Sequence, residues 1–193
     1  MKLKLFPLNL VALPSKIIPL HIFEERYKKM INECIEKKKE FGIIYQKKET
    51  QSKIGCSVSI EKIINIYPDG RMDVVVKGNR IFKVQRQYIQ QDIAIGDITF
   101  MPEPVPLDKN IFNPLLDKYI KLLLAAGLKD NIDHHLAKTL TFELLEMIQT
   151  SHNFELELLR LSSEEQRSEI LNRFFTSILD QSELFKPNER YQS

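Results

Sequence analysis

Residues 57–76 read SVSIEKIINIYPDGRMDVVV, and this stretch decides the fold of the first half of the chain. Apolar residues recur at alternate positions on both sides of residues 67–70 (YPDG), with a break at Lys62. Such alternation is the period of a β-strand. Proline presets φ and glycine accepts positive φ, so YPDG is typical of a tight turn. The pattern predicts a β-hairpin that places Val58, Ile60, Ile64 and Ile66 on one inward face.

Further strands are predicted on both sides of this hairpin. Residues 41–45 (FGIIY) form a short apolar run, and a second turn is expected at residues 77–79 (KGN) before strands at 81–88 and 93–100. Between residues 24 and 38 the spacing changes to that of a helix with one apolar stripe, formed by Tyr27, Met30, Ile31, Cys34 and Ile35. About six short strands with one inserted helix predict a small closed barrel, because open sheet edges invite aggregation.

Three prolines within residues 102–106 interrupt this pattern. Proline continues neither a central strand nor a helix, so residues 102–108 are predicted to be a linker. The predicted domains are therefore a β-barrel subdomain at 1–101 and a helical bundle subdomain at 109–193. The charge divides at the same place. Residues 1–107 hold 18 basic and 12 acidic residues, whereas residues 108–193 hold 10 and 14.

Helical periodicity dominates the second part. A helix is expected to open at Asn113-Pro114 and to stop at Gly127, because these residues suit the two ends of a helix. A second helix is expected over residues 131–148, a short one over 154–161, and another from Ser163, whose SEEQ sequence has the form of a capping box. Short amphipathic helices need partners, so a bundle is expected, and the fold class is α+β.

Composition, the two cysteines and the N-terminal sequence together predict a folded, soluble, cytoplasmic protein. Hydrophobic residues make up 43% and charged residues 28% of the 193 residues. No apolar run approaches the ~18 residues that a membrane span needs, and the N-terminus lacks the apolar core of a signal peptide. The two cysteines, Cys34 and Cys56, form no disulfide framework and no zinc motif.

A family resemblance covers about residues 3–100. The blocks that carry it occur in the family's order and are Leu5–Leu8 (LFPL), Pro19–Tyr27 (PLHIFEERY), Phe41–Ile44 (FGII), Ile54–Cys56 (IGC), Pro68–Arg71 (PDGR) and Gly78–Val84 (GNRIFKV). Together they resemble the N-terminal, substrate-recognition domain of ATP-dependent Lon proteases. Residues 159–171 resemble the helical half of that domain less distinctively. The resemblance implies a PUA-like β-barrel, a following helical bundle, and a role in recognising protein substrates.

No catalytic constellation is visible, so the chain is predicted not to be an enzyme and to need no cofactor or metal. No P-loop sequence occurs. Adjacent helical residues point about 100° apart, so His134 and His135 suggest a solvated helix surface and not a metal site. Cys34 lies on the apolar stripe and is expected to be a buried, inert thiol. His21 suggests a packed joint before the helix, with contact to a partner as the alternative reading.

Two functions from different classes remain. The favoured one is a stand-alone polypeptide-binding module that recognises unfolded or exposed hydrophobic segments, with a protease or chaperone as a candidate partner. Its candidate binding residues, assigned from their predicted loop positions, are Leu13, Pro14, Ile17 and Tyr67. The alternative is an RNA-binding PUA-like module, which the basic first half suggests. The oligomeric state is left open.

Overall fold

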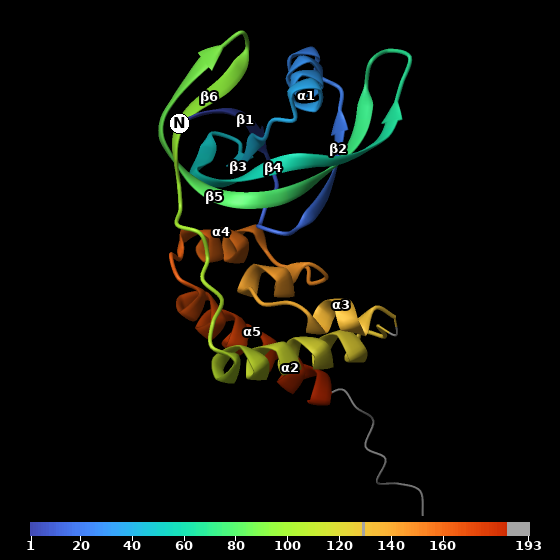
Figure 1. Cartoon of the computed structure of the whole chain (residues 1–193), viewed down its shortest axis with the longest axis vertical. Helices are drawn as coiled ribbons and strands as arrows, with labels where there is room; N and C mark the ends of the chain where they lie inside the picture. The colour runs from blue at the N-terminus through green and yellow to red at the C-terminus, as the bar shows by residue number, and fades with distance from the viewer. Residues whose placement is uncertain (129, 185–193) are drawn as a thin grey trace, which may run out of the picture. The chain divides into compact units, whose positions relative to one another are not determined.

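The computed structural model describes residues 1–128 and 130–184, which form a mixed α+β fold (Figure 1). They contain a six-stranded sheet, five α-helices and a short 3₁₀ helix. The chain divides into two compact units. The first, the sheet unit, comprises Met1–Glu103 and Ile148–Ser162; the second, the helical unit, comprises Pro104–Met147 and the described residues from Ser163 on. The predicted boundaries at 101 and 109 lie near one of these crossings, and the return of residues 148–162 to the sheet unit was not anticipated.

The sheet unit is built on strands whose pairings form a closed ring. The strands are β1 (Lys2–Leu8), β2 (Ile17–Ile22), β3 (Phe41–Lys47), β4 (Thr50–Ile66), β5 (Met72–Gln90) and β6 (Ile93–Phe100). Their order is β2-β5-β4-β3-β1-β6, and β6 also pairs with β5. Five strands therefore complete the ring, while β2 lies outside it and pairs with β5 alone.

The predicted hairpin is confirmed, and both of its strands are longer than expected. Strand β4 has 17 residues and β5 has 19, joined by the turn at Tyr67–Gly70, where Gly70 has a φ of 78°. The Gly70 amide donates to the Tyr67 carbonyl at 2.9 Å. Beyond this turn, β5 pairs with β2 and β4 at the same time over residues 72–77, and then with β6 over residues 82–90.

The turn predicted at residues 77–79 is wrong, because these residues lie inside β5. Gly78 is required there for another reason. A Cβ atom at this position would lie 2.0 Å from the Leu13 carbonyl oxygen. The Ser15 amide donates to the Gly78 carbonyl at 2.8 Å, and the Gly78 amide donates to the Lys16 carbonyl at 3.0 Å. Glycine therefore allows the β1–β2 connection to lie directly against β5.

Helix α1 (Glu25–Lys37) closes one side of the ring and confirms the predicted stripe. Tyr27, Met30, Ile31 and Cys34 are buried in one cluster with apolar residues from all six strands. Lys38 ends the helix in the left-handed conformation, with φ of 49°, and the next amide, that of Lys39, donates to the Cys34 carbonyl at 3.0 Å. This cap turns the chain sharply into β3.

Helix α4 (His152–Arg160) also belongs to the sheet unit and confirms the short helix predicted near residues 154–161. Ser151 caps it by accepting a hydrogen bond from the Phe154 amide. Lys16 Nζ donates to Glu155 Oε1 at 2.6 Å, and the Glu155 side chain is 3% exposed. This partly buried ion pair connects α4 to the β1–β2 connection.

The helical unit is centred on α2 (Lys109–Ala125) and α5 (Glu164–Leu184), which pack together. Tyr119 and Phe175 are fully buried, with ring centroids 6.2 Å apart. Helix α2 begins five residues earlier than predicted because Asp108 caps it, accepting from the Asn110 amide at 2.8 Å. Pro114 therefore lies inside the helix and not at its first position.

The single helix predicted over residues 131–148 is wrong. The structure has a five-residue helix α3 (Ile132–Leu136) and a 3₁₀ helix η1 (Thr141–Leu145) instead. Glu143 Oε2 accepts from the amides of Thr139 and Leu140 at 2.7 and 2.9 Å. This carboxylate satisfies the backbone where the helix would otherwise continue, which favours the break.

Candidate functional site: the exposed end of the hairpin

The end of the β4–β5 hairpin exposes apolar side chains because β4 extends beyond the end of its neighbour β3. Pairing between β3 and β4 stops at Phe41↔Val58, whereas pairing between β4 and β5 continues to Ile66↔Met72. From residue 60 to residue 66, β4 is thus hydrogen-bonded on its β5 side only. Its second edge is unpaired within the part of the chain that the structure describes.

The three isoleucines Ile63, Ile64 and Ile66 are 37%, 56% and 61% exposed. Ile63 is in register with Val74, and Ile66 with Met72, so both lie on the face that carries the buried core. Register shifts between Ile60 and Lys62 and between Ile63 and Asn65 mark irregularities in this half of the strand. The apolar face of the sheet therefore runs outward from the core into solvent.

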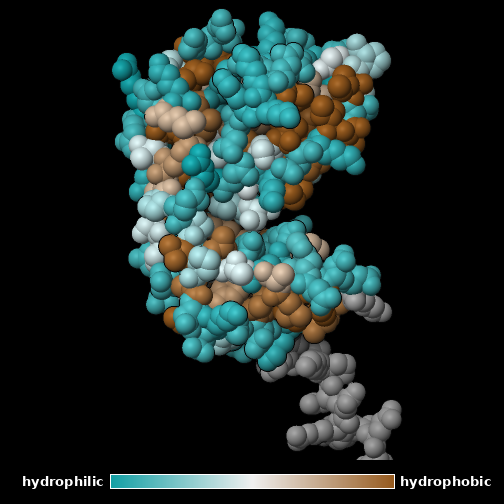
Figure 2. Space-filling model, in the orientation of Figure 1, coloured by the Kyte–Doolittle hydropathy of each residue, from teal (hydrophilic) through white to brown (hydrophobic). Residues whose placement is uncertain are grey.

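Phe23, directly after β2, adds an aromatic ring that is 60% exposed. Ile22 of β2 pairs with Met72, which in turn pairs with Ile66, so Phe23 lies at the same end of the sheet as the isoleucines. We call Phe23, Ile63, Ile64, Ile66 and Tyr67 the hairpin surface. Figure 2 shows hydrophobic side chains gathered over this part of the sheet unit, with hydrophilic ones around them.

A polar network holds the rings at the hairpin end. Asp73 accepts from the Tyr67 hydroxyl at 2.7 Å, and its other oxygen lies 2.6 Å from His21 Nδ1. These hydrogen bonds from His21 and Tyr67 hold the pKa of Asp73 below its ordinary value. The His21 ring contacts Phe23 and Tyr67, each with a centroid separation of 6.0 Å. His21 is thus part of an exposed joint between β2 and the hairpin.

The turn itself is anchored to helix α1. Lys28 Nζ donates to the Asp69 carbonyl at 2.9 Å and to Glu25 Oε1 at 2.7 Å. Lys28 is buried although it is charged, so its aliphatic stem covers apolar surface between α1 and the turn. Asp69 also accepts from Arg71 Nε at 2.7 Å. These contacts restrain the tip, so the hairpin surface is presented in a preformed arrangement.

The structure places the four predicted binding residues differently from one another. Leu13 is fully buried, and we remove it from the candidate surface because it has no exposed side chain to offer. Pro14 is half-buried beside it. Ile17 is exposed at the far end of β2, in register with Lys77. Only Tyr67 lies at the hairpin end, where it is half-buried.

Sequence reasoning missed Phe23, Ile63, Ile64 and Ile66 as surface residues. The period-two pattern was interpreted as an inward-facing row that included Ile64 and Ile66, but the register shift between Ile63 and Asn65 puts Ile63, and not Ile64, on the core side together with Ile66. The missing information was the length of the neighbouring strand, because the alternation along β4 looks the same whether or not β3 lies beside it. Phe23 had no such signal either, because an apolar residue directly before the N-cap of a helix, here Glu24, is as typical of packing as of exposure.

The groups most able to do chemistry are held in structural roles. Burial raises the pKa of the Cys34 and Cys56 thiols, which keeps both protonated at neutral pH. The prediction of an exposed helix surface is confirmed for His134. It is wrong for His135, which is buried and whose Nδ1 lies 2.9 Å from the Tyr119 hydroxyl oxygen. Burial lowers the pKa of His135. Within residues 1–128 and 130–184, no three His, Cys, Asp or Glu side chains are arranged to hold a metal ion.

Comparison with known proteins agrees with this architecture. The family model for the ATP-dependent protease La (LON) substrate-binding domain matches residues 2–183. A Lon protease of Cytophaga hutchinsonii is 23% identical over 124 residues, which are 60% of this chain and 14% of that protein. The chain thus spans about a seventh of the length of that relative.

Two solved structures share the fold. A Lon N-terminal domain protein from Xanthomonas campestris superposes with a TM-score of 0.71 at 25% identity, covering 90% of this chain and 98% of that one. The N-terminal domain of the Mycobacterium avium complex Lon protease gives a TM-score of 0.75 at 14% identity, covering 91% and 98%. In the described part of this chain, none of the helices has the length and apolar character needed to cross a membrane.

Proposed function

Because this chain belongs to the family of ATP-dependent protease La (LON) substrate-binding domains, we propose that it is a non-catalytic module that binds unfolded polypeptides through exposed hydrophobic segments. The observation that carries the proposal is the hairpin surface, where isoleucines of one strand remain exposed beside Phe23. Contiguous exposed apolar side chains with a polar rim mark interaction sites on folded proteins. In this role the chain recognises a client and passes it to a separate protease or chaperone.

The proposed binding mode uses the unpaired edge of β4. An extended client segment adds as a further strand along residues 60–66, where β4 has a partner on one side only. Main-chain hydrogen bonds of this kind depend little on sequence, while side-chain contacts supply the preference. Ile63, Ile64 and Ile66 would then select clients with apolar residues. An unfolded chain offers such segments, and a folded one conceals them.

The closed ring of strand pairings also supports a proposal about the architecture of the sheet unit. We interpret the ring of β5, β4, β3, β1 and β6 as the PUA-like barrel that the family resemblance implies. The packing of α2 against α5 is the nucleus of the proposed helical bundle. The ring matters for function because it fixes the base of the hairpin, from which the exposed end of β4 projects.

Charge pairing reduces the basic surface that suggests the RNA-binding alternative. Of the 18 basic residues before the linker, six form close ion pairs, at 3.2 Å or less, with carboxylates of the sheet unit: Lys4, Lys16, Arg26, Lys28, Lys37 and Arg71. Paired cations are poorly available for phosphate contacts, on which RNA affinity depends. The hairpin surface, by contrast, consists of apolar and aromatic side chains.

A titration with a labelled, permanently unfolded protein tests the proposal. The double variant Ile64→Ser/Ile66→Ser should bind about tenfold more weakly, because it removes two large apolar contacts while leaving the core intact. Ile89→Ser is the matched control, since Ile89 is an isoleucine of β5 that is 67% exposed and lies outside the hairpin surface. It should bind like the wild type.

The same titration is repeated at two salt concentrations and with a mixed RNA pool. Binding of the unfolded protein should depend weakly on salt, whereas RNA binding would weaken steeply through counterion release. Tight, salt-sensitive RNA binding without polypeptide binding would falsify the proposal and favour the RNA-binding alternative. Equal losses in the double variant and in Ile89→Ser would move the binding site away from the hairpin.

A further inference from the structure

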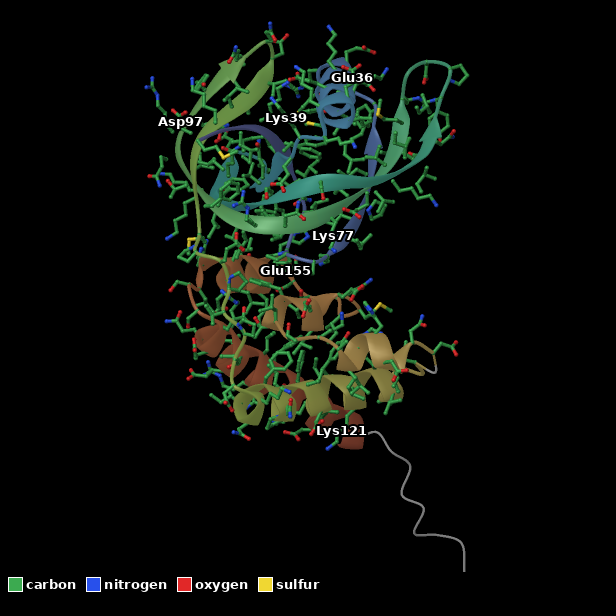
Figure 3. The ribbon with its side chains drawn as sticks, in the orientation of Figure 1. Glu36, Lys39, Lys77, Asp97, Lys121 and Glu155 are labelled. Atoms are coloured by element: carbon green, nitrogen blue, oxygen red, sulfur yellow. The ribbon has the colours of Figure 1, made fainter. Side chains whose placement is uncertain are left out.

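A second concave site lies in the sheet unit, beside the first residues of β1. It is a cavity of about 480 Å³ that extends from the C-terminal end of α1 to the last residues of β5. Leu3, Cys34 and Ile95 contribute apolar lining, and all three are buried. Figure 3 labels Lys39, another lining residue, between α1 and the β5–β6 side of the sheet unit. A volume of this size suits one or two amino-acid residues.

Cationic side chains outnumber carboxylates around this cavity. Its lining includes Lys2, Lys4, Lys39 and Arg80, against Glu33 and Glu40. Glu33 already pairs with Lys4 and with Lys37, and these lysines lower its pKa. Glu40 accepts from the Asn79 amide group at 2.8 Å. Both carboxylates are therefore engaged, and the net charge at the cavity favours an anion.

Two of these lysines, Lys2 and Lys39, form no ion pair within 4 Å among the described residues, although Tyr88, and Asp97 opposite Lys2 in β6, raise the pKa of Lys2. Lys39 follows the left-handed cap of α1 and forms no ion pair within that part of the chain. Lys2 Nζ lies 5.5 Å from the centre of the Tyr88 ring. Arg80 stacks on Phe100 at 3.7 Å and reaches Glu103 only at 3.6 Å. These groups can turn toward an incoming anion without breaking a close ion pair.

The backbone beside the cavity is also incompletely paired. Strand β1 pairs with β6 from Lys2 to Leu5, but its pairing with β3 begins only at Leu5↔Gly42. Among the strands that the structure describes, residues 2–4 thus have a partner on the β6 side alone, and they line the cavity. A short extended peptide is a ligand that suits such an open edge.

We infer that this cavity binds the C-terminal carboxylate of a polypeptide whose last residue is apolar. A terminal residue of this kind supplies an anion and an apolar side chain together, which matches the cationic rim and the lining of Leu3, Cys34 and Ile95. In an internal acidic segment the polypeptide must both enter and leave the cavity, so such a segment needs more room than a chain terminus does. The inference rests on the proposed function in that the ligand is a client polypeptide.

The test compares two fluorescent peptides of one sequence that ends in leucine. One has a free C-terminal carboxylate, and the other a C-terminal amide. The protein is the full chain with any tag at its C-terminus, because Lys2 and its neighbours line the cavity. The acid should bind about tenfold more tightly than the amide, the difference expected for a charge-assisted hydrogen bond. Replacing the terminal leucine by serine should weaken binding of the acid.

The variant Lys39→Gln should lower the affinity for the acid about threefold to tenfold and leave the affinity for the amide unchanged. Its control is Lys77→Gln, an exposed lysine of β5 that Figure 3 shows well away from Lys39. Equal binding of acid and amide, absence of binding up to millimolar concentration, or equal effects of the two lysine variants would each overturn the inference.

The hairpin variant separates this inference from the proposed function. In Ile64→Ser/Ile66→Ser the ratio of acid to amide affinity should be unchanged, because the hairpin surface and the cavity share no residue. If the unfolded protein fails to bind while the acid is still preferred, the proposed function fails and the terminal site stands. If the acid and the amide bind alike while the hairpin variant binds the unfolded protein more weakly than the wild type does, the proposed function stands and the terminal site fails.

Discussion

The two halves of strand β4 have similar apolar content but very different surroundings. Residues 54–58 lie between β3 and β5 and are all buried, whereas residues 61–66 pair with β5 alone and are all exposed. Both halves present aliphatic side chains on the core face of the sheet. The difference teaches that the number of neighbouring strands, and not the alternation along a strand, decides whether an apolar row becomes core or recognition surface.

The largest expected effect contrasts the two environments directly. Ile31→Ala removes a fully buried side chain that belongs to the same cluster as Val58, so it should lower the free energy of unfolding by about 2–5 kcal/mol. Ile64→Ala removes an exposed side chain and should change it by less than about 0.5 kcal/mol. Urea unfolding of both variants checks this. Similar losses would mean that Ile64 is covered in solution.

A second prediction sharpens the contrast at the level of the backbone. At an unfolded-client concentration about ten times its dissociation constant, amide hydrogen exchange should slow about tenfold for solvent-facing amides of residues 60–66. Exchange in residues 54–58 should stay unchanged, because both edges of that half are already paired. Mass spectrometry of peptic fragments can resolve the two halves. Slowing confined to other segments would contradict strand addition at β4.

The smallest expected effect concerns the network that holds the hairpin end. The pKa of Asp73 is lowered from its usual 3.8 by hydrogen bonds from His21 and Tyr67. A lowered folded-state pKa means that the carboxylate stabilises the fold above pH 3.8 and loses this contribution as the pH falls through the folded value.

Asp73→Asn should therefore shift the urea midpoint slightly downward at pH 7 and less at pH 3. The comparison of variant and wild type at the two pH values is the measurement, and Asp69→Asn is not a suitable control because Asp69 carries its own lowered pKa. Asp92→Asn, at the turn between β5 and β6, is the better one. A midpoint difference that is the same at both pH values would show that Asp73 acts without its charge.

Local sequence signals predicted the elements whose stability is local. The YPDG turn and the stripe of Tyr27, Met30, Ile31 and Cys34 specified a hairpin and a helix, and both are confirmed. Elements set by distant contacts were missed. Gly78 was interpreted as a turn residue, although the Leu13 carbonyl, distant in sequence, is what excludes a side chain there. The break after Leu136 depends on a side chain, Glu143, that competes for the backbone.

The candidate site was predictable in kind and less so in position. An apolar surface on the sheet unit followed from the family resemblance, and Tyr67 was placed at its tip. Ile63, Ile64 and Ile66 became candidates only when the lengths of β3 and β4 could be compared. The cavity beside β1 depends on four separate segments, including residues 1–4 and Arg80, which no periodicity relates.

Helix α4 has a practical consequence for anyone who dissects this chain. Because residues 148–162 belong to the sheet unit, the polypeptide crosses between its two units more than once, and the units are interleaved in sequence. A truncation after residue 101 would remove α4 and leave Lys16 without its partner Glu155. Genetic fragments that respect this interleaving would instead join residues 1–103 to 148–162 through a short artificial linker.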